Sequence, residues 1–597
     1  MITDSVSYIY AQQNNTEVLN SESSGISLRQ LNWTNNNKER ISLALETNIK
    51  DSSNVTLLAD VKQAASLEQA TNSSWSVIST DFVPIIENTA YNFSLGVSAK
   101  DVNQLHSKVY YYDSDKTEIS SDFIFGGKDG TFEGNFSKAV SPPPEAKFFE
   151  LQMWIRQTLG KDAEFSLIHI DISKIVTNVT TSNQTSGARM PYIVNSQNGL
   201  AVERVFSGVN DSTSMAFLGP NDILILERGS GKVIRILDGK MQGTLIDLNS
   251  VYKDGLLGIV TTKNQDNNPY VFLFYNEAPS EYNSDIENLT EAAEVNSTLG
   301  YNRLGDRLVR YELVDNKLTN PKLLFELKSP IPGKNLEEEH HGGELIIGPD
   351  GALYLVIGDL DGWKYDVKTK AQNYKDGIEP DGRAGILRIT QDGKVSNNGI
   401  IGNTFPLNLY YAYGIRNSYG MDFDPVTGNL WDTENGPDYG DEINLVKPGF
   451  NSGSDLVQGL STESNLLHSL EDFGGKGNYS DPEFVWTIPV APTAIKFFNS
   501  KEYGPEYEND MFVADVNNGN IYHFDLNQNR TELVLSGPLK DKVADKPSEL
   551  DGITFARGFG GITDMQIGPD GFLYVLTLED YTNEKYAGSV YRINPKS

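Results

Sequence analysis

Residues 346–362 read IIGPDGALYLVIGDLDG, in which a Gly-Pro-Asp-Gly turn leads directly into a series of apolar residues. A turn of this kind before Leu, Tyr, Val and Ile is typical of a β-strand. A second apolar stretch, GRAGILRITQDG at 382–393, follows and offers a neighbouring strand. The pattern predicts a small antiparallel sheet, which cannot bury both of its faces unless another sheet packs against it.

The same pattern of turn and strand recurs on both sides of this stretch. Related copies stand at 217–239, 423–446, 509–526 and 567–593. Radial packing of such sheets buries their faces economically, and the chain shows almost no helical periodicity. The sequence therefore predicts an all-β protein with a six-bladed β-propeller over residues 193–597.

The residues before this region show longer alternating strands. Residues 26–176 contain stretches such as ISLALET, AYNFSLGVSA and FFELQMWI, which predict a β-sandwich of jelly-roll type, similar to a carbohydrate-binding module. Residues 177–192, TNVTTSNQTSGARMPY, lack a strand pattern and are interpreted as a linker. Residues 1–25 are interpreted as an N-terminal tail, with a signal-peptide remnant as one explanation.

Charge and composition narrow the set of partners. The chain has 49 basic and 81 acidic residues, a net charge of −32, and no cysteine. Such a surface repels phosphate backbones and anionic lipids, and the sequence lacks an apolar segment of about 20 residues, so we expect neither nucleic-acid partners nor a membrane span. The absence of cysteine excludes disulfides and thiolate metal sites.

Frequent Asn-x-Ser/Thr sequons favour a secreted or cell-surface glycoprotein of a bacterium or archaeon, although a chain rich in Asn and Ser also forms sequons by chance. They include Asn32, Asn54, Asn92, Asn135, Asn178, Asn183, Asn288 and Asn296.

His340 and His341 stand side by side, after Glu337–Glu339 and before a Gly-Gly pair. The pair is either an incidental feature of a strand start or a general base directed into a site. Zinc binding by both imidazoles is disfavoured, because adjacent residues on a strand point to opposite faces. We expect the three glutamates to lie in solvent.

Five motifs together resemble the glucose/sorbosone dehydrogenase family over about residues 200–595. They are HHGGELIIGPDGALYLVIGD, GRAGILRI, YAYGIRNSYGMDFDPVTGNLW, ENGPDYGDEINLVKPG and GPDGFLYVLT. The resemblance implies a six-bladed propeller that oxidises aldose sugars with pyrroloquinoline quinone (PQQ) and calcium.

The resemblance also assigns roles to residues of the site. His340 matches the general base that takes the proton of the sugar C1 hydroxyl while hydride moves to the quinone. Asp359 matches the carboxylate that orients this imidazole. Arg416 and Asn417 match the pair that contacts the quinone oxygens, and Thr577 matches a further cofactor-binding position.

The metal positions implied by the resemblance lie in ENGPDYGDE. Gly436 and Pro437 match backbone carbonyls that hold calcium against the quinone, and calcium accepts such oxygen ligands. Asp441 and Glu442 match acidic positions of a second, structural calcium site. Solvated turn acids are the alternative interpretation for Asp441 and Glu442.

The cations that meet the three PQQ carboxylates in the family are replaced here by Gly561, Thr563 and Asn517. Each lost charge-assisted hydrogen bond costs about 1.5–3 kcal/mol unless Lys253, Arg557 or Lys585 substitutes. Two functions therefore stay open. The chain is either a PQQ- and calcium-dependent aldose dehydrogenase that uses an external electron acceptor, or a propeller without PQQ that serves as a glycan-binding or cell-surface module. The sugar, the acceptor and the oligomeric state are not defined by the sequence.

Overall fold

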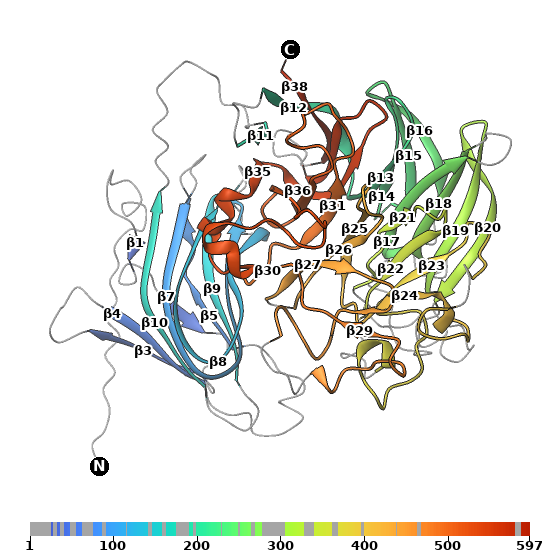
Figure 1. Cartoon of the computed structure of the whole chain (residues 1–597). Helices are drawn as coiled ribbons and strands as arrows, with labels where there is room; N and C mark the ends of the chain where they lie inside the picture. The colour runs from blue at the N-terminus through green and yellow to red at the C-terminus, as the bar shows by residue number, and fades with distance from the viewer. Residues whose placement is uncertain are drawn as a thin grey trace, which may run out of the picture. The chain divides into compact units, whose positions relative to one another are not determined.

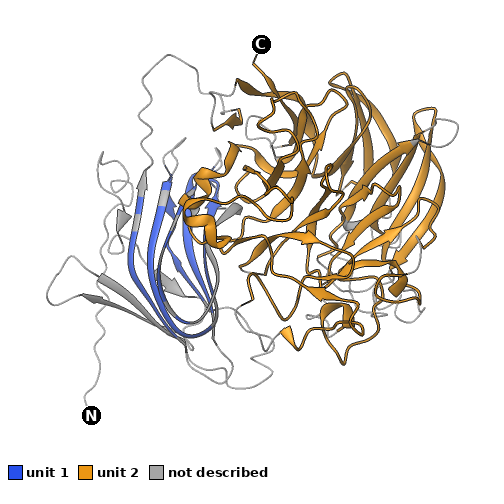
Figure 2. Ribbon diagram, in the orientation of Figure 1, with its two compact units in different colours: residues 1–183 blue, residues 184–597 orange. Residues whose placement is uncertain are grey.

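The computed structural model divides the chain into two compact units, residues 1–183 and 184–597 (Figure 2). This boundary falls inside the stretch 177–192. The described residues are 26–27, 33–35, 41–47, 55–61, 76–85, 91–114, 116, 118–140, 142, 146–157, 163–174, 190–194, 199–228, 230–248, 251–263, 269–277, 305–327, 340–360, 368–395, 399–437, 439–461, 467–579 and 587–596.

Unit 1 is built from ten strands in one continuous sheet (Figure 1). Its strands are β1 (Ile26–Ser27), β2 (Trp33–Asn35), β3 (Ile41–Thr47), β4 (Val55–Val61), β5 (Ser76–Thr80), β6 (Val83–Pro84), β7 (Tyr91–Tyr112), β8 (Glu118–Val140), β9 (Phe148–Gln157) and β10 (Ala163–Lys174). The main order is β2-β5-β9-β7-β10-β4-β3, with β8 pairing along β7.

The long strand β7 organises this sheet. Its first part, up to Lys100, pairs with β10, and its second part, from Val102, pairs with β9. Alternate residues such as Phe93, Leu95 and Val97 are buried in one apolar core, as the period of a half-buried strand requires. Because the described strands form one continuous sheet, the jelly-roll sandwich stays a prediction.

Unit 2 contains six mainly antiparallel sheets of four to six strands each. The first holds β13 (Ser212–Gly219), β14 (Asp222–Glu227), β15 (Lys232–Leu237) and β16 (Lys240–Asp247). The second holds β17 (Val251–Lys263), β18 (Pro269–Glu277), β19 (Gly305–Val314) and β20 (Lys317–Leu327). The third holds β21 (Leu345–Ile347), β22 (Leu353–Ile357), β23 (Gly385–Ile389), β24 (Tyr410–Tyr413), β28 (Phe450–Asn451) and β29 (Asn478–Tyr479).

The other three sheets follow along the chain. The fourth holds β25 (Ser418–Phe423), β26 (Leu430–Glu434), β27 (Asp441–Val446), β30 (Phe484–Trp486) and β34 (Val543–Ala544). The fifth holds β31 (Pro492–Phe497), β32 (Met511–Asp515), β33 (Ile521–Phe524), β35 (Thr554–Arg557) and β11 (Tyr192–Ile193). The sixth holds β36 (Gly560–Ile567), β37 (Leu573–Glu579), β38 (Gly588–Pro595) and β12 (Leu200–Val209).

The described helical segments are four short 3₁₀ turns: η5 (Lys370–Gln372), η6 (Leu407–Leu409), η7 (Gly537–Asp541) and η8 (Pro547–Gly552). None of the helices in these residues is long and apolar enough to cross a membrane.

One edge strand of each sheet contacts the corresponding strand of the next sheet. We call these the inner strands: β13, β17, β21, β25, β31 and β36. The contacts run in chain order and return from β36 to β13, so the inner strands form a closed circuit. Strand β12 completes the sixth sheet at the edge opposite β36, where it lies beside β38, with Leu200 opposite Pro595.

A buried ionic group connects four of the sheets. The Nζ of Lys496 on β31 lies 3.5 Å from Glu344 Oε1, which precedes β21. The pKa of Lys496 is raised by the nearby carboxylates of Asp422, Glu344 and Asp564, which outweigh its burial. Burial raises the pKa of Glu344 to about 8, although Lys496 opposes this effect. The lysine thus offsets negative charge contributed by β25, β36 and the residue before β21.

Candidate active site

His340 and Asp359 form the centre of the candidate site, one at the entry to β21 and the other just after β22. The Nδ1–H of His340 donates to Asp359 Oδ1 over 2.7 Å. Asp359 is fully buried, whereas 12% of the His340 side chain is exposed. A buried carboxylate on Nδ1 fixes the ring and leaves Nε2 for a second partner.

Arg416, which precedes β25, completes this group. Its Nη2 lies 3.2 Å from His340 Nε2, and its Nη1 donates to the carbonyl oxygens of Asn435 and Gly436 at 2.9 and 3.0 Å. A guanidinium has no acceptor, so it donates to Nε2, and the imidazole therefore carries its proton on Nδ1. The site thus holds a hydrogen-bonded series from Arg416 through His340 to Asp359.

Gly358 explains why these backbones can come so close. A Cβ at this position would collide with the carbonyl oxygens of both His340 and Arg416. The backbone N–H of Asp359 also donates to Arg416 O over 2.9 Å. His340 itself has a φ of 59°, a left-handed conformation that His, Asn and Asp adopt more readily than most residues.

His341 points away from this group, although both histidines precede β21 and do not lie on a strand as the sequence argument assumed. It is buried, and its Nδ1 lies 3.0 Å from Asp306 Oδ1, which also accepts from Asn276. The second histidine therefore attaches the segment that carries His340 to the neighbouring sheet. The sequence contained no signal for this pairing, because Asp306 stands 35 residues away.

Tyr374 and Asp455 are additional polar groups near the site that the sequence did not identify. The Tyr374 hydroxyl donates to Asp455 Oδ2 over 2.8 Å. The pKa of Asp455 is raised by burial and by the negative charge of Asp359, and Arg416 opposes this shift. These electrostatic interactions place Asp455 near both Asp359 and Arg416.

Asp441 and Glu442, the predicted ligands of a structural calcium, are both buried rather than solvated. Asp441 accepts three backbone N–H bonds, from Gly436 at 2.9 Å and from Val490 and Ala491 at 2.7 Å each. Burial raises its pKa to about 6 in spite of these bonds. Asp441 thus holds two turns together, including the one that contacts Arg416.

Glu442 belongs to a second group of acids, on the paired strands β26 and β27. Glu434 lies opposite Glu442, and Asp432 lies opposite Asn444. Burial raises the pKa of Glu434 to about 7 and that of Asp432 and Glu442 well above the ordinary range, with mutual repulsion adding to the effect. Neither carboxylate oxygen of Asp432 has a hydrogen-bond partner of normal geometry among the described residues. This chemistry suits a calcium ion with oxygen ligands.

The two other predicted cofactor residues have different surroundings. Asn417 is buried, and its Oδ1 lacks a hydrogen-bond partner in the described part of the chain. Thr577 is also buried, but its hydroxyl accepts from Ser589 N over 3.1 Å within the sixth sheet. Asn417, which follows Arg416 in the chain, therefore has an unused side-chain oxygen. The Thr577 hydroxyl is already used within its own sheet.

The positions that the resemblance assigns to cofactor cations remain without positive charge. Asn517 donates to Pro489 O, Thr563 lies against the backbone of β37, and Gly561 has a φ of 65°. Arg557 is paired with Asp551. The side chains of Lys253 and Lys585, and residues Glu337–Glu339, lie outside the described residues. Gly436 O, a predicted calcium ligand, is occupied by Arg416, while Pro437 is exposed.

The structure thus combines an all-β unit of six sheets with a hydrogen-bonded His–Asp–Arg group. The glucose/sorbosone dehydrogenase family matches residues 209–585, and the chain belongs to this family. The aldose sugar dehydrogenase of Escherichia coli is 24% identical over 390 residues, which cover 64% of this chain and 90% of the relative. Quinoprotein glucose dehydrogenase B of Acinetobacter calcoaceticus is 24% identical over 460 residues, which cover 65% and 87%.

Solved structures give a similar result. The aldose sugar dehydrogenase of Escherichia coli in the apo-form covers 66% of this chain and 99% of its own, with 22% identity and a TM-score of 0.48. The PQQ-bound enzyme of Streptomyces coelicolor covers 66% and 98%, with 20% identity and a TM-score of 0.45. Because both scores are below 0.5, the family assignment depends on the sequence match.

Proposed function

We propose that this chain is an oxidoreductase that oxidises the anomeric hydroxyl of aldose sugars, with His340 as the general base. The hydrogen-bonded series Arg416–His340–Asp359 carries this proposal. A hydroxyl bound at Nε2 would deliver its proton to the unprotonated ring nitrogen, which it would have to share with Arg416 or take over from it, and Asp359 would stabilise the imidazolium that forms. A hydride must also leave the anomeric carbon that carries this hydroxyl, and it needs an acceptor. PQQ would supply that acceptor when bound.

The residues fit one half of PQQ. Arg416 offers a donor for quinone oxygens, and a fixed guanidinium favours the charge that develops there. The unpaired atom of Asn417 is its Oδ1, which accepts hydrogen bonds, so its amide would have to turn to donate to the quinone. Gly561, Thr563 and Asn517 do not fit the carboxylate half, because they offer no cation. We therefore propose that the cofactor binds more weakly than in relatives that retain these cations.

We further propose that the six sheets are the six blades of a propeller, and that unit 1 is a carbohydrate-binding sandwich. The closed circuit of inner strands supports the first proposal. The sequons support an extracellular or cell-surface location. Mass spectrometry of the protein from its native cells would detect glycans at the sequons, and recovery only from the cytoplasm would contradict this location.

The missing cations favour a second candidate function. Without PQQ, the same unit would serve as an extracellular glycan-binding module. Such a protein would bind sugars without oxidising them, and its binding would not depend on added cofactor.

One experiment separates the two functions. Purified protein receives calcium and PQQ, and cofactor absorbance and dye reduction are followed with a panel of aldoses. The dehydrogenase proposal expects reduction that requires both PQQ and an aldose. If no PQQ binds at micromolar concentration while immobilised glycans retain the protein, the dehydrogenase proposal is wrong and the binding-module function replaces it.

A further inference from the structure

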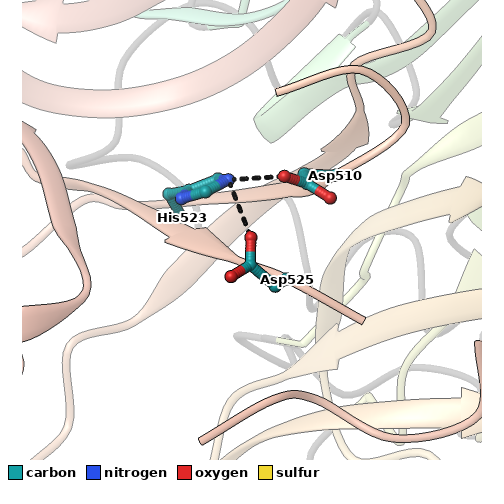
Figure 3. A group of neighbouring side chains, drawn as sticks. All are labelled: Asp510, His523 and Asp525. Atoms are coloured by element: carbon teal, nitrogen blue, oxygen red, sulfur yellow. Dashed lines mark hydrogen bonds and ion pairs between the residues drawn. The ribbon is translucent and has the colours of Figure 1, made fainter. Parts of the chain in front are cut away.

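Three potential metal ligands converge at one end of the β32–β33 hairpin, in the fifth sheet (Figure 3). The Nε2 of His523 lies 3.0 Å from Asp510 Oδ2 and 3.8 Å from Asp525 Oδ1. One ligand atom from each residue lies within 4.8 Å of the others. Both carboxylates are thus directed at the same ring nitrogen.

The strand register produces this arrangement. His523 and Asp525 are two residues apart on β33 and the residue after it, so their side chains leave the same face. Met511 pairs with Phe524, which places Asp510 beside the following residue, Asp525. The three ligands therefore come from two adjacent backbones that the ladder holds in fixed register.

Aromatic side chains hold the imidazole in place. The rings of Tyr507 and Phe512 each lie 5.1 Å from the His523 ring, and Phe555 packs against both. This packing reduces the rotamer freedom that His523 would lose on binding an ion. The exposed fraction of the Asp525 side chain is 62%, so one side of the group stays open to water.

The separations suit a small metal ion. Tetrahedral zinc with bonds of about 2.0–2.1 Å places neighbouring donor atoms about 3.3 Å apart. The two measured separations, 3.0 and 3.8 Å, lie on either side of this value. Small side-chain rotations would therefore allow all three atoms to bind one ion.

The charge of the group is also favourable. The nearby Arg530 does not neutralise these acids, because its Nε donates to both oxygens of Asp424 at 2.8 and 2.9 Å. Two carboxylates thus share a single imidazole as their partner in the described ion pairs.

We propose that Asp510, His523 and Asp525 form a binding site for a divalent transition metal, of which zinc fits best, with water in the remaining position. Imidazole together with carboxylates favours zinc and its transition-metal neighbours over calcium and magnesium, which prefer oxygen ligands alone. This site does not depend on the proposed dehydrogenase function.

The site is separate from the His340 group. The β32–β33 turn contains Asn517, whose N–H donates to Val490 O, and Val490 in turn donates to Asp441 beside Gly436. The metal ligands lie at the opposite end of this hairpin, about 17 Å away by the rise of a five-residue strand. Zinc at this end would fasten the open end of the hairpin.

The test uses untagged, EDTA-treated protein titrated with zinc alone by isothermal calorimetry, with calcium and manganese as comparison ions. We expect one zinc ion per chain in preference to calcium, and a higher unfolding temperature with zinc. His523→Gln should weaken zinc binding by at least about 100-fold, because even partners of ligands contribute about 10–100-fold. Asp525→Asn, at a largely exposed position, provides a second variant in case His523→Gln fails to fold.

His468→Gln is the matched control, because this exposed histidine belongs to no such group among the described residues. It should bind zinc as the unmodified protein does. Equal zinc affinity in the unmodified protein, His523→Gln and Asp525→Asn would overturn the proposal. The proposal would also fail if the unmodified protein took up no zinc while His523→Gln lowered stability, since the group would then be an ion pair alone.

Discussion

The guanidinium of Arg416 donates to His340 Nε2 over 3.2 Å, at the same nitrogen that would accept the substrate proton in the proposed function. The arginine therefore selects the tautomer of His340 that carries its proton on Nδ1. This N–H donates its hydrogen bond to Asp359. A substrate hydroxyl has to share this nitrogen with Arg416 or displace it. Ligand binding and movement of the arginine are consequently coupled.

Replacement of His340 by asparagine is expected to reduce aldose oxidation by about 10²- to 10⁴-fold, the usual contribution of a positioned base. Asparagine tolerates the positive φ of this position, so folding should persist. Dye reduction with PQQ and calcium measures the loss, and circular dichroism checks the fold. Unchanged turnover would show that another group accepts the proton.

The Asp359→Asn variant tests the orientation of the imidazole. Because Arg416 keeps the ring proton on Nδ1, asparagine would accept it through a neutral amide oxygen and would no longer stabilise the imidazolium that forms. We expect turnover to fall by at least about 100-fold while the sugar KM changes little. A fall confined to KM would instead indicate a role in sugar binding.

Introduction of cations should strengthen PQQ binding. Thr563→Arg and Asn517→Lys each add a charge at a position that matches a family cation, and each is expected to improve affinity by about 1.5–3 kcal/mol. Gly561 is a poorer choice, because its φ of 65° disfavours a side chain. Spectroscopic titration with PQQ provides the measurement.

Asn403→Lys is the control for these variants, since it adds the same charge at an exposed position before η6. If it strengthened PQQ binding as much as Asn517→Lys, the effect would come from net charge and not from the site.

Calcium and pH should act together on stability. The pKa of Glu434 is raised from 4.5 to about 7 in the folded chain. Between these pH values the folded chain therefore binds more protons at Glu434 than the unfolded chain does. Its contribution to stability is therefore present below about pH 4.5 and lost as the pH rises through about 7. Millimolar calcium should restore part of it above pH 7, as measured by urea unfolding in calcium and in EDTA. Identical curves in the two solutions would argue against a cation at Asp432, Glu434 and Glu442.

Lys496→Met is expected to destabilise unit 2 by about 3–5 kcal/mol, because it leaves buried carboxylates without their cation. Glu344, whose pKa burial already raises to about 8, holds its proton at neutral pH, so the loss falls on Asp422 and Asp564, whose raised pKa values Lys496 otherwise opposes. The loss should consequently shrink as the pH is lowered. Denaturant unfolding measures it, with Lys540→Met as a control at an exposed lysine.

The sequence predicted most of the sheets because each depends on a local signal. Turns such as Gly348–Gly351 and Gly568–Gly571 precede strands at the positions expected from their residue pattern. The second sheet, β17–β20, was absent from the set of repeats because it lacks such a turn. Its strands are marked only by apolar runs, such as 271–275 on β18, all of which are buried, and such runs give no information about which strand is the partner.

The site was predicted less completely, since its contacts join residues far apart in the chain. The motifs predicted His340, Asp359 and Arg416 as residues of one site, and the structure places them in one hydrogen-bonded group. The motifs did not reveal that His341 binds Asp306, or that Tyr374 binds Asp455. A single carboxylate in a loop carries no pattern, so only the folded chain identifies its partner.

Pairing of β12 with β38 has a consequence for synthesis on the ribosome. Leu200 finds its opposite residue only when Pro595 has left the exit tunnel. At about 5–20 residues per second, β12 waits about 20–80 s with an unpaired edge. During this interval the exposed edge can pair with a neighbouring polypeptide, so covering it until β38 is complete would lower the risk of aggregation.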